Sequence, residues 1–270
     1  MGLSGKISCF LILLIFTVCL LSPYIVSSRP DSIDLDSLKQ PPSMKHLFGT
    51  DNKGRDILSR VLYGGRISIS IAVLAALISM TIGLVIGLMS GYFGGKLDIF
   101  FMALVDLVLA FPSLLLAIGV SVLFPPGVYT VMIALSAVGW ASFARLIRGQ
   151  VFSLREASFI EAAKAAGCGN ARILLVHILP QCIPLAFVMT GLKLGGYIIT
   201  EAGLSFLGLG AQPPTATWGS MISANRVFIS SAPWMVLAPG ILIAITALSF
   251  NVLGDDLREK YAVNKSSRVL

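Results

Sequence analysis

Residues 67–92 read ISISIAVLAALISMTIGLVIGLMSGY, and this stretch decides the fold. It contains no charged residue, and it is longer than the roughly 20 apolar residues that a helix needs to cross a bilayer. Gly83, Gly87 and Gly91 recur at every fourth position, which places them on one helix face. Small residues at that spacing let two helix backbones approach closely. We therefore expect a membrane-spanning helix that packs tightly against a second one.

The whole chain has the composition of a membrane protein. Of its 270 residues, 56% are hydrophobic and 12% are charged, and the mean hydropathy is +0.89. Soluble domains usually carry about 25% charged residues. The other apolar runs are at about 7–26, 97–124, 128–143, 183–207 and 234–253. The sequence thus predicts an all-α polytopic membrane bundle of about six transmembrane helices.

Prolines punctuate these apolar runs. Pro112 lies in the third run and Pro184 in the fifth, and Pro239-Gly240 falls within the sixth. Proline removes a helix hydrogen bond, so we expect interrupted helices at these three points.

The first run, 7–26, follows the single Lys6. No A-x-A-like cleavage site follows it, so we interpret it as a retained transmembrane helix rather than a signal peptide. The polar residues after it predict an external loop up to residue 65. The four cysteines form no C-x-x-C pair, which argues against a disulfide framework.

The net charge of +7 does not indicate nucleic-acid binding, because the basic residues are scattered between apolar segments rather than gathered on one face. Six spans place both termini on one side of the membrane. The basic residues that follow the fourth run form one cluster: Arg145, Arg148, Arg155, Lys164 and Arg172. By the positive-inside rule, this cluster and both termini are predicted to be cytoplasmic.

The segment from 154 to 180 contains the most informative motif, Glu161-Ala-Ala-Lys-Ala-Ala-Gly167 followed by His177-Ile-Leu-Pro180. We expect a helix over 154–166 whose end is capped by Gly167 in a left-handed conformation. A second short helix is predicted to end near Pro180, because the residue before a proline resists the α region. Alanines on the surface of this helix–turn–helix would let a partner protein approach closely.

This motif resembles the cytoplasmic signature of ABC importer permeases, E-A-A-x3-G-x9-I-x-L-P. The matching positions are Glu161, Ala162, Ala163, Gly167, Leu179 and Pro180. The chain departs from the pattern at His177, where the signature has isoleucine. The resemblance implies that the segment is a coupling helix that docks into an ATP-binding subunit, with Glu161 and Gly167 as its key positions.

Other stretches are similar to the dipeptide/oligopeptide/nickel branch of these permeases. They are GTDNKGRDILSR at 49–60, AFPS at 110–113, EAGLSFLGLG at 201–210, QPPTATWG at 212–219 and FNVLGDDLR at 250–258. The resemblance implies an N-terminal helix and external loop over 1–65, a permease core over 66–258 and a cytoplasmic tail over 259–270.

The same resemblance implies a function and a set of partners. The chain would form half of the translocation path of an ATP-driven importer for short peptides or a related small solute. Its partners would be two ATP-binding subunits, a second homologous permease and an external solute-binding protein. Its location would be a bacterial or archaeal plasma membrane.

No enzyme motif accompanies these features. A Walker A loop requires G-x4-G-K-[ST], and at Gly94-Gly95-Lys96-Leu97 leucine stands where the hydroxyl belongs. We therefore expect ATP and magnesium to bind to partner subunits and no cofactor or metal to bind here.

Three ionisable residues lie inside apolar runs: Asp106, Lys193 and Glu201. Each would cost about 2.5–3.5 kcal/mol at the centre of an inserted helix, so such residues normally face a bundle interior or a water-filled path. Lys193 and Glu201 are eight residues apart, or about 80° around a helix. We predict that these residues lie on or beside the translocation path. The alternative is that Glu201 only caps or pairs near the outer end of its span.

Two other functions are alternatives to an importer of short peptides. A nickel or nickel-chelate importer is the main alternative, although neither histidine lies in a span and a metal path favours such ligands. A secondary transporter is less favoured, because that class usually shows internal repeats and more spans.

Overall fold

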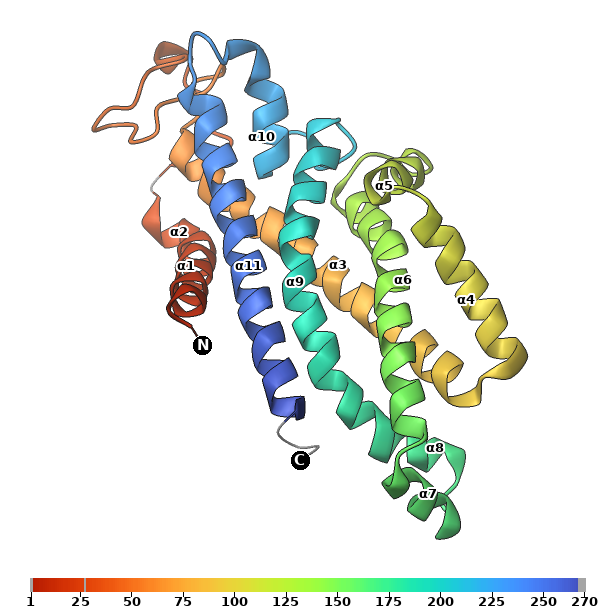
Figure 1. Ribbon diagram of the computed structural model, residues 1–270. Helices are drawn as coiled ribbons and strands as arrows, with labels where there is room; N and C mark the ends of the chain where they lie inside the picture. The colour runs from red at the N-terminus through yellow and green to blue at the C-terminus, as the bar shows by residue number, and fades with distance from the viewer. Residues whose placement is uncertain (1, 27, 267–270) are drawn as a thin grey trace.

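The computed structural model describes residues 2–26 and 28–266, and this part of the chain is helical without any strand. Its long helices form a bundle in which α3 crosses behind α6, α9 and α11 (Figure 1). Five helices are long and apolar enough to cross a membrane, and a bent pair makes up to six. The predicted polytopic helical fold is confirmed.

The helices have the following bounds. They are α1 Leu3–Leu20, α2 Ser22–Ile25, α3 Ile57–Phe93, α4 Gly95–Ala110, α5 Ser113–Val122, α6 Val128–Arg155, α7 Ser158–Ala165, α8 Asn170–Arg172, α9 Leu179–Phe206, α10 Trp218–Asn225 and α11 Trp234–Ser266. Single turns of 3₁₀ helix lie at Leu35–Ser37 and Arg226–Phe228, and a π-helical turn lies at Ile173–Ile178.

The helix α3 packs against α6 through the predicted glycine face. A side chain at Gly83 would meet Phe143 Cβ at 2.4 Å, and one at Gly87 would meet the Ala144 carbonyl oxygen at 2.7 Å. At Gly91 the neighbour is Val151, also at 2.7 Å. The two backbones therefore lie too close for any larger residue, as the small-residue spacing predicts.

The third apolar run is not one helix. It breaks into α4 and α5 at Phe111-Pro112, and the two helices differ in direction by 96°. Phe111 is extended (φ −92°, ψ 144°), as expected for a residue before proline. The predicted interruption at Pro112 is thus confirmed, and the span over 97–124 is a bent pair.

Two other predicted interruptions are wrong. Pro184 lies inside α9 and Pro239 inside α11, and both helices continue through them. The second short helix does not end near Pro180 either. The helical path from Asn170 runs on to Phe206, and Pro180 lies inside it, directly after the π-helical turn Ile173–Ile178.

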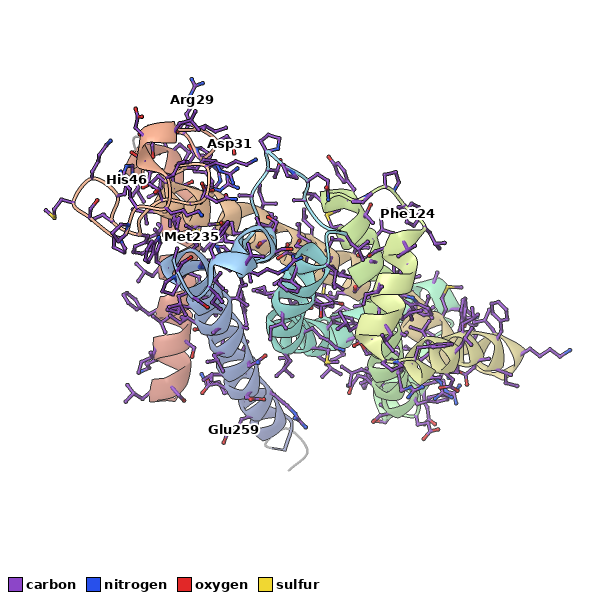
Figure 2. The ribbon with its side chains drawn as sticks, turned by 90° about the horizontal axis from the view of Figure 1, so that it is seen from above. Arg29, Asp31, His46, Phe124, Met235 and Glu259 are labelled. Carbon is purple, nitrogen blue, oxygen red and sulfur yellow. The ribbon has the colours of Figure 1, made fainter. Side chains whose placement is uncertain are left out.

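The segment 28–56 is a folded connection rather than a loose loop. The carboxylate of Asp51 accepts hydrogen bonds from the backbone N–H groups of Lys53 and Arg55 and from Arg55 Nε at 2.6 Å. Arg60, on the first turns of α3, donates to the Pro30 carbonyl oxygen at 2.9 Å. Figure 2 shows Asp31 and His46 from above on this side of the molecule, with Phe124 far across it. The segment is therefore fastened to the start of α3.

The bundle has two distinct ends. One end carries the segment 28–56 and α10, and we call it the α10 end (Figure 1). The other carries α7 and α8, and we call it the α7 end. The described end of α11 lies toward the α7 end (Figure 1), and near the start of α1 the Gly2 N–H donates to Asp256 Oδ1 of α11 at 2.8 Å.

Candidate functional site

The α7–α8 segment, residues 156–180, projects from the end of the bundle beyond the long helices (Figure 1). The helix α7 closes with a hydrogen-bonded turn in which Gly167 N–H donates to the Lys164 carbonyl at 2.9 Å and Cys168 N–H to the Ala163 carbonyl at 3.0 Å. Gly167 has φ +80°, the left-handed conformation that this turn requires. The predicted glycine cap is confirmed.

One side of the segment holds it to the bundle. Ile160 is fully buried and packs in a cluster with Ile173, Ile178 and Val151 of α6. The Tyr92 hydroxyl, at the end of α3, donates to Asn170 Oδ1 at 2.9 Å. The segment is therefore held against the ends of α3 and α6 by apolar packing and a hydrogen bond.

The other side of the segment is open. Glu161, Ala162, Gly167 and Pro180 are exposed, and Ala163 and Leu179 are half-buried. Because these side chains are small or absent along α7, the helix backbone itself is accessible to a partner. The helix begins at Ser158, however, and not at 154 as predicted, because α6 continues to Arg155.

Asp106 on α4 forms an ion pair with Arg145 on α6. Both side chains are more than half exposed on the chain taken alone, at 68% and 51%. A charged pair in an apolar span is costly against lipid, so this face of α4 and α6 must be covered by protein or water in the membrane.

A second ion pair joins the same helices nearer the α7 end. Arg148 donates to both carboxylate oxygens of Asp98, and the hydroxyl of Ser90 donates to the same carboxylate. Arg155, about two helical turns further along α6, lies over the Phe152 ring at 5.0 Å. The α3–α4 turn and the last turns of α6 are thus connected by charged hydrogen bonds.

Glu201 is fully buried between three helices. Its Oε1 accepts a hydrogen bond from Ser205 Oγ at 2.8 Å, and the hydroxyls of Ser68 on α3 and Thr217 before α10 face the same carboxyl group. Thr217 also caps α10 by accepting from the Ser220 N–H. The other carboxylate oxygen, Oε2, is buried without a hydrogen-bond partner, so the carboxyl group lies between α9, α3 and the start of α10 with one oxygen unpaired.

The three candidate path residues are not brought together. Asp106 is exposed on α4, Glu201 is enclosed near α10, and Lys193 is half-buried on α9. No hydrogen bond or ion pair joins any two of them within the described residues. Across residues 2–26 and 28–266, no group of three histidine, cysteine or carboxylate side chains is placed to hold a metal ion.

Sequence reasoning missed the partners of these groups. It assigned Arg145 and Arg148 to a cytoplasmic loop, whereas both lie on α6 opposite the aspartates of α4. The sequence does carry a signal. Asp98 and Asp106 are eight residues apart in the third apolar run, and Arg145 and Arg148 are three residues apart just after the fourth run. On helices, both spacings place the pair close to one face.

Comparisons with known proteins agree with this architecture. Residues 83–261 match the family described as "Binding-protein-dependent transport system inner membrane component". The dipeptide transport system permease protein DppC of Alkalihalophilus pseudofirmus is 42% identical over 90% of this chain and 80% of its own length. The glutathione transport system permease protein GsiD of Escherichia coli is 41% identical over 92% of this chain and 82% of its own.

A solved structure shares the fold. The MetNI methionine ABC transporter, crystallised in an inward-facing conformation, aligns with a TM-score of 0.61 at 18% identity, over 75% of this chain and 97% of the other. A family of this description implies ATP-binding subunits, a partner permease and a solute-binding protein as working partners. The chain belongs to the binding-protein-dependent transport system inner membrane components, and it is a multi-pass plasma-membrane permease subunit of an ABC importer rather than an enzyme.

Proposed function

We propose that this chain forms half of a translocation path for short peptides and that the α7–α8 segment couples it to an ATP-binding subunit. The observation that carries the coupling role is the open, alanine-lined side of α7, ended by Gly167 at φ +80°. The peptide class is supported by the names of the relatives, since a dipeptide and glutathione are both short peptides.

In this proposal the α7 end faces the cytoplasm, together with both termini. Two ATP-binding subunits, which bind ATP and magnesium, each receive the coupling segment of one permease chain. Glu161 and Gly167 are the main coupling positions, and Ala162, Ala163, Leu179 and Pro180 complete the surface. Closure of the two ATP-binding subunits draws the coupling segments together. The movement reaches the bundle through α6 and α3, because Ile160 and Asn170 are held by those helices.

The structure favours a place on the translocation path to a different degree for Asp106, Lys193 and Glu201. The exposed Asp106–Arg145 pair favours a water-filled or protein-covered face on α4 and α6, where a hydrophilic solute could pass. Lys193 is half-buried and forms no ion pair within the described residues, so it is proposed as a secondary contact. Glu201 is enclosed by hydroxyl groups, which favours the alternative in which it positions helices.

The experiment is uptake into proteoliposomes that contain the chain, its partner permease, both ATP-binding subunits and the solute-binding protein. We expect ATP-dependent uptake of a radiolabelled dipeptide that disappears when either the ATP-binding subunits or the second permease is omitted. A nickel-chelate arm provides the comparison: uptake of ⁶³Ni without dipeptide uptake would replace the peptide assignment. Uptake without the ATP-binding subunits would contradict the coupling mechanism.

A further inference from the structure

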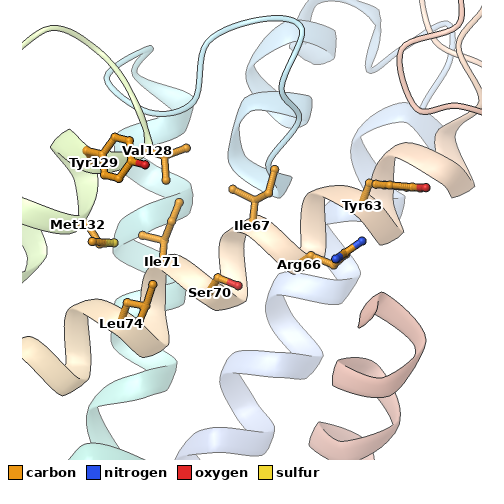
Figure 3. A pocket seen from close by; sticks show the side chains of 9 residues that line it. All are labelled: Tyr63, Arg66, Ile67, Ser70, Ile71, Leu74, Val128, Tyr129 and Met132. Atoms are coloured by element: carbon orange, nitrogen blue, oxygen red, sulfur yellow. The ribbon is translucent and has the colours of Figure 1, made fainter. Parts of the chain in front are cut away.

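A cavity of about 620 Å³ lies between α3 and the first turns of α6, toward the α10 end. Figure 3 shows its wall: Arg66 and Tyr63 at one side, and Tyr129 and Met132 of α6 at the other. The volume is within the ~300–1,000 Å³ typical of small-molecule sites. None of the residues discussed for coupling or for the translocation path lines it.

Arg66 is the only charged residue in the wall of this cavity. Its guanidinium carbon lies 5.9 Å from the centre of the Tyr63 ring, and no carboxylate of the described residues forms an ion pair with it. The residue stands directly before the uncharged run 67–92. An unpaired guanidinium at the edge of a span needs an anion or the polar membrane surface, so the site favours a negatively charged group.

Apart from Ser70 and two tyrosines, the rest of the wall is apolar and suited to hydrocarbon. Ile67, Ile71 and Leu74 follow Arg66 along the same side of α3, in the direction of the membrane interior, and Met132 faces them from α6 (Figure 3). Tyrosines at membrane–water interfaces place their rings at headgroup level, and Tyr63 and Tyr129 stand beside the apolar part of the wall. The cavity thus combines one cationic side chain, Arg66, with an apolar groove that extends away from it along α3.

We propose that this cavity binds a membrane phospholipid, with the phosphate at Arg66 and an acyl chain along Ile67, Ile71 and Leu74. A peptide fits less well, because its ammonium group would require a carboxylate and no acidic residue lines the cavity. A guanidinium donates paired hydrogen bonds to phosphate oxygens, so Arg66 is suited to the phosphate of a lipid headgroup. A bound lipid would fill the space between α3 and α6 at the end of the bundle opposite the coupling segment. The inference does not depend on the identity of the transported solute.

The test uses the complete transporter in nanodiscs of phosphatidylcholine with a minor share of phosphatidylglycerol. Native mass spectrometry after gentle extraction counts the phosphatidylglycerol that remains bound. Arg66→Gln should lower its retention about 10-fold or more, because a charged hydrogen bond is lost. Arg66→Lys should keep most of it. Arg29→Gln removes an exposed arginine of the 28–56 segment that is absent from the cavity wall, so it should change nothing.

A second variant keeps the test decisive if Arg66→Gln fails to assemble. Leu74→Trp should fill the apolar groove and lower retention of the lipid while Arg66 stays in place. Equal retention in wild type, Arg66→Gln and Leu74→Trp would overturn the proposal. Displacement of phosphatidylglycerol by a saturating dipeptide would also overturn it and assign the cavity to the solute.

Discussion

Arg148 on α6 holds Asp98 on α4 through two parallel hydrogen bonds, from Nε to Oδ1 at 2.5 Å and from Nη2 to Oδ2 at 2.7 Å. Paired hydrogen bonds of this kind fix orientation as well as distance. Arg148 lies seven residues before the end of α6, and α6 leads directly into the α7–α8 segment. The pair therefore sets where the coupling segment stands relative to α4.

Asp98→Asn should weaken this connection by about 1–3 kcal/mol, because a charged hydrogen-bond pair becomes a neutral one. We expect a lower unfolding temperature for the purified subunit and less dipeptide transported per ATP hydrolysed. The double variant Asp98→Arg with Arg148→Asp should recover part of the loss. Wild-type coupling in Asp98→Asn would show that the ion pair does not position the segment.

Gly87→Ala should destabilise the subunit by about 1–3 kcal/mol, because the new methyl group would overlap α6. At this position a Cβ atom would lie 2.7 Å from the Ala144 carbonyl oxygen and 2.8 Å from Ile147 Cβ. The thermal unfolding midpoint of the purified subunit measures the effect. Gly149→Ala on α6 is the control, since nothing lies within 4 Å of its Cβ position and alanine favours a helix. An unchanged midpoint for Gly87→Ala would contradict the close packing of α3 on α6.

Glu201→Ala should cost more than Glu201→Gln. The alanine variant leaves the buried Ser205 hydroxyl without its acceptor, and a buried unsatisfied group costs about 1–3 kcal/mol. Glutamine keeps an acceptor oxygen in the same place. Thermal unfolding and the yield of assembled transporter are the measurements. Equal stability of both variants with selective loss of uptake would instead place Glu201 on the translocation path.

Gly167→Ala should distort the end of α7, because a left-handed conformation costs a residue with a Cβ atom roughly 1–2 kcal/mol. We expect weaker association with the ATP-binding subunits, measured by co-purification, and reduced uptake. Gly169→Ala is a matched control two residues away: Gly169 has φ −67°, and nothing lies within 4 Å of its Cβ position. If the Gly167 and Gly169 variants associate equally well with the ATP-binding subunits, the left-handed turn at Gly167 is not required for coupling.

The long apolar runs could be read from the sequence, but the ends of the helices could not. Hydropathy reports which residues lie in lipid, whereas a helix extends as far as its caps and side-chain partners allow. The helix α3 thus begins at Ile57, where the Asp56 carboxylate accepts from the Ser59 N–H at 2.8 Å. In the same way α6 continues past its apolar part to Arg155, since its arginines find partners on α4.

The surroundings of single residues also could not be predicted from the sequence. Proline breaks the chain direction at Pro112 but not at Pro184 or Pro239, because packing decides whether the helix can continue through it. The glycine cap at Gly167 followed from local chemistry and was predicted correctly. Whether Glu201 faces water or other side chains depends on the rotation of α9 in the bundle, which a single sequence does not specify.

The most direct measurement is the accessibility of Ala162→Cys to a membrane-impermeant maleimide, in a chain with Cys9 and Cys168 replaced by serine. Ala162 is exposed on α7, and the two remaining cysteines, Cys19 and Cys182, are buried. We predict labelling in inside-out vesicles, none in right-side-out vesicles, and protection when the ATP-binding subunits are bound. Labelling from the outer face, or equal labelling with and without the ATP-binding subunits, would contradict the coupling account.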